Sequence, residues 1–132
     1  ADAAKARGLG VVVSAVDPCV DSNVFQETAV RRELDLASLL SSVDAVSLHV
    51  PLGEARLAMM GAREFDLMRP GAVFINTARG RLVDEGALVE ALRSGAIAAA
   101  GLDVFEEEPL PEGHRLLGAP NLILTPHSAA FS

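Results

Sequence analysis

Three short segments of the 132-residue sequence contain residue types that could act together on a small molecule. Residues 76–80 contain an arginine, residues 101–109 contain an aspartate and three consecutive glutamates, and residues 125–127 end in a histidine. A planar guanidinium binds a carboxylate through two parallel hydrogen bonds, and an imidazole is the most frequent general acid in proteins. One guanidinium, one carboxylate and one imidazole together are suited to the reduction of a 2-keto acid.

Each of these segments lies at or just after the end of a short apolar run that is typical of a strand. The runs are apolar throughout, which favours strands buried on both faces and therefore a parallel sheet. They cover residues 11–16, 45–50, 72–75, 98–104 and 121–124.

Helical patterns separate the apolar runs. The clearest covers residues 84–94, with Asp84 as a good N-cap, an apolar stripe, and Gly95 after the last turn. Shorter patterns cover residues 1–7, 35–42 and 62–68. The alternation predicts an α/β fold built from right-handed βαβ units, which is a doubly wound parallel sheet.

Ligands of doubly wound sheets bind beyond the carboxyl ends of the strands. The polar residues with possible chemistry lie at or shortly after those ends, so we expect them along one edge of the sheet. They are Asp17, His49, Arg79, Asp103, Glu108 and His127.

Asp17 follows the first apolar run and allows two interpretations. In a dinucleotide-binding fold, a carboxylate at this position accepts hydrogen bonds from the adenine-ribose hydroxyls. It would repel a 2′-phosphate, which favours NAD over NADP. The alternative is a turn begun by the Asp17–Pro18 pair, a common feature at strand ends.

Composition narrows the classes of function and partner. A net charge of −7 argues against a nucleic acid or an anionic membrane surface as partner. No run of about 18 apolar residues is present that would span a membrane. The single cysteine, Cys19, excludes an internal disulfide and favours a reducing compartment such as the cytoplasm. Three scattered histidines and one cysteine give no metal-ligand spacing.

In this order and at this spacing, the three segments resemble the D-isomer-specific 2-hydroxyacid dehydrogenase family, and the resemblance covers nearly the whole chain. It implies a Rossmann-like NAD-binding domain and a small 2-keto or 2-hydroxy acid as substrate. It also implies that Arg79 anchors the substrate carboxylate and polarises its carbonyl, and that His127 is the general acid. Glu108 directly precedes Pro109, as the family's catalytic glutamate precedes its proline, and would support His127.

The resemblance further implies where NAD is bound. The backbone of Val50 and Pro51 would lie against the adenosine half of the cofactor, and the backbone of Ala78 and Arg79 would approach the nicotinamide. Asp103 would lie near the nicotinamide carboxamide. The expected cofactor-binding residues are Asp17, His49, Val50, Pro51, Thr77, Ala78, Arg79, Asp103 and His127. For His49 a structural role remains the alternative, and we assign it no catalytic role.

The sequence departs from the family pattern at its start. It contains no Gly-x-Gly-x-x-Gly triplet, so the first strand and the glycine-rich turn are expected to be missing. That strand is central in the usual strand order, and its absence should leave a gap that exposes two strand edges. We therefore expect residues 1–132 to form a partial NAD-binding domain without the substrate domain. Homodimerisation is expected from the resemblance alone.

Two other classes of function remain open. Residues 128–130 (Ser-Ala-Ala) resemble the branch of the family that contains the C-terminal-binding-protein corepressors and their bacterial relatives. Those proteins keep the same arginine, glutamate and histidine, so an NAD(H)-sensing interaction protein is one alternative. An inactive fragment that binds nothing well is the other.

Overall fold

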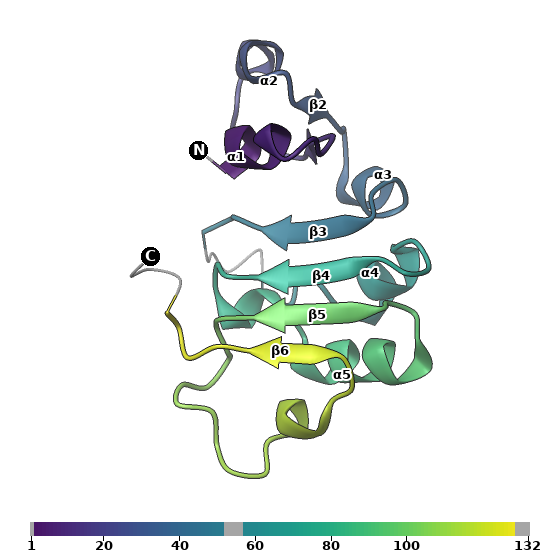
Figure 1. The fold of residues 1–132 in the computed structure, drawn as a ribbon, viewed down its shortest axis with the longest axis vertical. Coiled ribbons are helices and arrows are strands. Elements are labelled where there is room, and N and C mark those ends of the chain that lie inside the picture. Colours follow the sequence, from purple (N-terminus) through teal and green to yellow (C-terminus); the bar gives the residue numbers. More distant parts are fainter. Residues whose placement is uncertain (1, 52–56, 129–132) are drawn as a thin grey trace. The chain divides into compact units, whose positions relative to one another are not determined.

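The computed structural model describes residues 2–51 and 57–128 (Figure 1). The chain divides into two compact units, Ala1–Ser42 and Val43–Ser132, and each unit is described by itself. Ala129 and Ala130, on which part of the resemblance to the corepressor branch rests, lie outside the described residues.

The first unit contains three helices and a small parallel sheet. Its elements are α1 (Asp2–Gly8), β1 (Ser14–Ala15), α2 (Ser22–Thr28), β2 (Arg31–Arg32) and α3 (Leu36–Leu40). The predicted helices at residues 1–7 and 35–42 are confirmed as α1 and α3. The Asp35 side chain caps α3 by accepting a 2.8 Å hydrogen bond from the Ser38 N–H.

The strand predicted at residues 11–16 is shorter than expected. Only Ser14 and Ala15 pair with β2, and Val12 is 87% exposed. Within the described residues β1 has a single neighbouring strand of two residues, so no ladder extends back to Val12. The sequence pattern also did not predict α2 or β2.

The second unit is built around a four-stranded sheet. Its regular elements are β3 (Ala45–Leu48), α4 (Ala62–Leu67), β4 (Val73–Asn76), α5 (Glu85–Ser94), β5 (Ala99–Leu102) and β6 (Leu122–Leu124). Two short 3₁₀ helices, η2 (Gly80–Leu82) and η3 (Arg115–Gly118), complete it. All pairings are parallel in the order β3-β4-β5-β6, with Asn76 opposite Leu48 and Leu102. The predicted parallel α/β sheet is confirmed.

The helix predicted at residues 84–94 matches α5 closely. The Asp84 side chain accepts a hydrogen bond of 3.0 Å from the Ala87 N–H, as an N-cap should. Gly95 ends the helix with φ at 77°, a left-handed conformation that costs glycine little.

The strands of this sheet are not buried on both faces, which corrects the expectation from their apolar sequences. One face carries Val46, Phe74 and Ala100, which are buried, and Figure 1 shows α4 and α5 on the same side of the sheet. Phe65 of α4 packs edge-on against Phe74, with ring centroids 5.3 Å apart. The other face leaves Ile123 72% exposed, because no described element of this unit packs against it.

The described strands fall into two separate sheets, as the absence of a central strand predicts. β1 and β2 form one sheet, β3 to β6 form another, and no pairing joins them within the described residues. The incomplete, Rossmann-like arrangement is therefore confirmed. Among the same residues, no helix has both the length and the apolar character needed to cross a lipid bilayer.

Candidate functional site

The loop after β4 is fixed by a buried amide. Asn76 has no exposed surface, and its Nδ2 donates a 2.9 Å hydrogen bond to the Arg79 carbonyl. Its Oδ1 accepts a 3.0 Å hydrogen bond from the Ala78 N–H. The Arg79 side chain is exposed and donates to the Ala78 carbonyl at 2.6 Å. The backbone that carries the guanidinium is therefore held from inside the protein.

The next residue, Gly80, brings the loop after β4 against the loop after β5. A Cβ atom at Gly80 would lie 1.9 Å from the Phe105 carbonyl carbon and 2.4 Å from the Glu106 nitrogen. These are backbone atoms that no side-chain rotation can move aside, so the contact requires glycine. Two of the three segments singled out in the sequence consequently touch through their main chains.

The loop after β5 also carries Glu108, which pairs with His127 from the segment after β6. The Nδ1 atom of His127 lies 2.7 Å from Glu108 Oε2, and Glu108 Oε1 accepts a 3.0 Å hydrogen bond from the Phe105 N–H. The bond from His127 and then that from Phe105 hold the pKa of Glu108 below its ordinary value, so its carboxylate is ionised at neutral pH.

The ionised carboxylate decides which ring nitrogen of His127 carries a proton. A carboxylate only accepts hydrogen bonds, so Nδ1 of His127 must be the donor in this pair. Nε2 is then the nitrogen that can exchange a proton with a substrate. The side chains of His127 and Glu108 are 45% and 37% exposed, so a small molecule can reach this pair.

Asp103, at the end of β5, holds the turn that contains His127. Its buried carboxylate accepts hydrogen bonds from the Thr125 hydroxyl and from the Ser128 N–H, the latter at 2.9 Å. These two contacts bracket His127, whose φ of 51° lies in the left-handed region. The structure therefore gives Asp103 a positioning role toward His127, the predicted general acid. Its proximity to the nicotinamide carboxamide stays a prediction.

The remaining predicted residues of this unit lie at the same carboxyl edge. His49, Val50 and Pro51 follow β3, while Thr77 and Ala78 follow β4. The His49 Nε2 atom lies 3.0 Å from the Ser47 hydroxyl, which favours the structural alternative for this histidine.

Asp17 belongs to the first unit. Its Oδ1 accepts a 2.9 Å hydrogen bond from the Cys19 N–H, which is the geometry of a turn begun by an Asp-Pro pair. The turn interpretation is thus realised in the structure, and the contact with the adenine ribose stays a prediction.

Sequence reasoning missed the roles of Asn76 and Asp103 as supports. Both are polar residues at strand ends, but only their burial separates them from ordinary turn residues. The information available in the sequence was their position at the ends of two apolar runs that contribute Phe74, Ala100 and Leu102 to the core.

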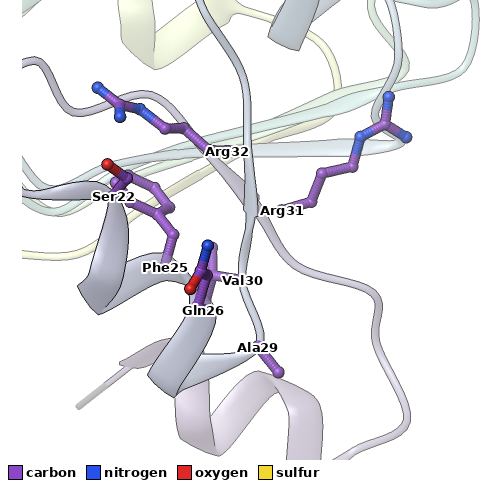
Figure 2. Close-up of a pocket in the computed structure, with 7 residues that line it drawn as sticks. All are labelled: Ser22, Phe25, Gln26, Ala29, Val30, Arg31 and Arg32. Atoms are coloured by element: carbon purple, nitrogen blue, oxygen red, sulfur yellow. The ribbon is translucent and has the colours of Figure 1, made fainter.

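A shallow hollow of the first unit lies apart in sequence from all predicted site residues. The Arg32 guanidinium carbon lies over the Phe25 ring, 5.4 Å from its centroid. Figure 2 shows that the Arg31 side chain points in another direction. The lining residues are Ser22, Phe25, Gln26, Ala29, Val30, Arg31 and Arg32. Within residues 2–51 and 57–128, no group of three or more His, Cys, Asp or Glu side chains could hold a metal ion.

Comparison with known proteins gives a family match over residues 1–129, to the model described as D-isomer specific 2-hydroxyacid dehydrogenase, NAD binding domain. The (S)-sulfolactate dehydrogenase of Chromohalobacter salexigens is 46% identical over 130 residues, 98% of this chain and 42% of that protein. A glyoxylate reductase of Korarchaeum cryptofilum is 42% identical over 130 residues, 98% of this chain and 39% of that protein.

A solved structure, D-lactate dehydrogenase with NAD+ from Lactobacillus jensenii, superposes with a TM-score of 0.88 at 37% identity. The match covers 98% of this chain and 42% of that one. The chain thus spans about two fifths of the length of these relatives.

Proposed function

The chain belongs to the D-isomer specific 2-hydroxyacid dehydrogenase family, whose NAD-binding domain it matches, and on this basis we propose that its protein transfers a hydride between NADH and a small 2-keto acid. The observation that carries the proposal is the hydrogen-bonded pair of His127 and Glu108 at the carboxyl edge of the sheet. Arg79 follows the neighbouring strand, and its loop touches the Glu108 loop at Gly80. We further propose that residues 1–132 are part of the NAD-binding domain and that the substrate domain lies elsewhere in the protein.

The described residues fit a nicotinamide dinucleotide as cofactor. The carboxyl ends of β3, β4 and β5 lie side by side, and dinucleotides bind at this edge of parallel sheets. When bound, the nicotinamide supplies the hydride that reduces the substrate. The backbone of Val50 and Pro51 would lie against the adenosine half of the cofactor, and the backbone of Ala78 and Arg79 would approach the nicotinamide. Asp17 would select NAD by its negative charge.

The residues of this chain then have separate tasks in the reduction. The Arg79 guanidinium binds the substrate carboxylate and polarises the carbonyl. His127 donates the Nε2 proton of its charged ring to the carbonyl oxygen as hydride reaches the carbon, which leaves the ring neutral with its proton on Nδ1. Glu108 keeps that proton in place by accepting its hydrogen bond. Such acid catalysis is worth about 10²- to 10⁴-fold.

The names of the relatives indicate the class of substrate. They include dehydrogenases or reductases of sulfolactate, glyoxylate and glycerate, which are all small acids. We infer a small 2-keto acid for this protein as well. The interaction-protein alternative is not favoured, because the matched relatives are named as enzymes.

The test is turnover of NADH by the protein that contains this domain, with a panel of 2-keto acids that includes glyoxylate, hydroxypyruvate and sulfopyruvate. His127→Gln should lower kcat by about 10²-fold or more with little change in NADH affinity. Absence of turnover with every keto acid, or full activity of His127→Gln, would contradict the proposal.

We also propose a homodimer that works in the cytoplasm. The dimer rests on the resemblance to the family, and the compartment rests on Cys19, an exposed free thiol that a reducing environment would keep reduced. Light scattering of the whole protein would test the dimer, and a monomeric mass at micromolar concentration would contradict it.

A further inference from the structure

A second carboxylate–imidazole pair lies in the same unit as the pair of Glu108 and His127. Glu85 is the first residue of α5, and its side chain is only 8% exposed. Its Oε2 atom lies 3.4 Å from Nε2 of His114, whose side chain is 22% exposed. The proposed chemistry uses neither residue.

Glu85 also holds the main chain of the loop that carries Glu108. Its Oε1 atom accepts a 2.8 Å hydrogen bond from the Glu106 N–H, twenty-one residues away in the sequence. Glu106 lies two residues before Glu108, and His114 lies six residues after it. One buried carboxylate therefore contacts the loop on both sides of Glu108.

The hydrogen bonds of the His114 ring agree with this arrangement. Its Nδ1 accepts a 3.4 Å hydrogen bond from the Leu116 N–H at the start of η3, so Nδ1 carries no proton. Nε2 then bears the proton and can donate toward Glu85. The imidazole thereby links the end of the loop to α5.

The buried Glu85 carboxylate has a partner at each of its two oxygens. Burial of a charge is costly unless it is hydrogen-bonded, and Glu85 has a backbone N–H, an imidazole and the N-terminus of α5. Glu108, by contrast, lies in an exposed loop, where placement depends on what holds the loop. A misplacement of about 1 Å at a reacting group can cost about 10²-fold in rate.

We propose that Glu85 is a positioning residue that fixes Glu108 against His127, through the Glu106 backbone and the His114 ring. The proposal rests on the proposed function, because it concerns the orientation of the same general acid. Glu85 itself touches no reacting atom.

The test compares Glu85→Gln with Glu90→Gln in the complete protein. Glu90 lies on the same helix, is exposed, and pairs with Arg93 at 3.1 Å, so it is a matched control. Glutamine at position 85 has one acceptor where two are needed. We expect kcat to fall about tenfold, with the KM for NADH within about twofold, while Glu90→Gln stays at the wild-type rate.

A double-mutant cycle shows whether Glu85 acts through Glu108. If it does, Glu85→Gln should have almost no further effect on kcat in a Glu108→Gln background. An equal loss in both backgrounds would mean a general structural effect and would overturn the proposal. So would a Glu85→Gln variant that matches Glu90→Gln.

Hydrogen exchange gives a readout that does not depend on turnover. The Glu106 amide should exchange at least about tenfold faster in Glu85→Gln than in Glu90→Gln, because its acceptor is weakened. Unchanged exchange at Glu106 overturns the proposal. If the wild-type protein shows no turnover but the Glu106 amide still exchanges faster in Glu85→Gln, the contact between Glu85 and the loop is supported. The proposed dehydrogenase function is then contradicted.

Discussion

Arg79 is a surface residue whose position is set by a buried one. Asn76 occupies a core position opposite Leu102 in the sheet, yet it uses both ends of its amide on the main chain of residues 78 and 79. A buried amide with both groups bonded is rigid, because loss of either bond leaves an unsatisfied polar atom at a cost of about 1–3 kcal/mol. The Arg79 side chain is therefore exposed but attached to a backbone whose position is fixed.

Arg79→Lys should separate substrate binding from cofactor binding. Lysine keeps the positive charge but loses the planar pair of donors that matches a carboxylate. We expect the KM for the keto acid to rise about tenfold or more, which corresponds to about 1.4 kcal/mol, with the KM for NADH nearly unchanged. Steady-state kinetics would show this, and Arg93→Lys on α5 is the control. An unchanged KM and turnover would remove Arg79 from the substrate site.

The lowered pKa of Glu108 should depend on His127. The hydrogen bond from His127 is the larger cause of the shift, and the Phe105 N–H is the next. His127→Ala should therefore move the pKa of Glu108 up toward its ordinary value of 4.5, with the Phe105 bond still opposing. Carbon-13 NMR of the side-chain carboxyl would follow the titration. A Glu108 titration unchanged by His127→Ala would show that the pair does not form in solution.

The same shift predicts the sign of a stability effect. Because the folded-state pKa lies below the unfolded one, the ionised Glu108 stabilises the fold at pH above 4.5. That contribution is lost as the pH falls through the lowered folded value. Denaturation of wild type and Glu108→Gln should consequently give a difference in unfolding free energy at neutral pH that closes in acid. A difference that grows in acid would contradict the assignment.

At the scale of elements, the candidate site is a set of loops that hold one another. The loop after β4 contacts the loop after β5 at Gly80, and Asp103 of the latter holds the turn after β6. The residues that hold these loops lie at strand ends or on α5. The helices and strands therefore fix the positions of the loops, and contacts between the loops fix the site side chains.

Gly80→Ala should disturb this assembly more than an alanine elsewhere. Its Cβ atom would overlap the Phe105 carbonyl, and one of the two loops would have to shift. We expect a loss of about 1–3 kcal/mol in the free energy of unfolding, typical of overpacking, together with reduced turnover. Gly118→Ala is the control, because a Cβ there meets no atom within 4 Å. Equal stabilities of the two variants would mean that the loops do not touch in solution.

The elements differ in how far the sequence predicts them. Helix α5 was predictable because its N-cap residue, its apolar stripe and its terminal glycine all indicate the same helix. Strands β3 to β6 were predictable from their apolar runs. Helix α2 was not, since Phe25 is its one buried residue and no stripe marks it. The Glu108–Pro109 pair identified the partner of His127 among three glutamates, but nothing local indicated that Glu85 or Asp103 reaches across the fold.

At the scale of the whole molecule, the two units differ in how many strands neighbour each strand and in the helices that cover the sheet. In the second unit β4 and β5 each have a strand on both sides and helices over one face. In the first unit β1 and β2 pair only with each other in the described part of the chain, over two residues each. Sheets of three or more strands with a buried face are stable, whereas isolated pairs of strands are marginal.

Hydrogen exchange of the 132-residue chain should reveal this difference at matched amides. The Arg31 and Glu33 amides donate to the Val13 and Ala15 carbonyls at 2.9 Å, and the Ala100 amide donates to Asn121 at 3.0 Å. All three are therefore hydrogen-bonded, and only their surroundings differ. Because Ala100 is released by opening of a four-stranded sheet, it should exchange about a hundredfold more slowly than Arg31 and Glu33. Equal protection at the three amides would mean that the two units open as one cooperative body.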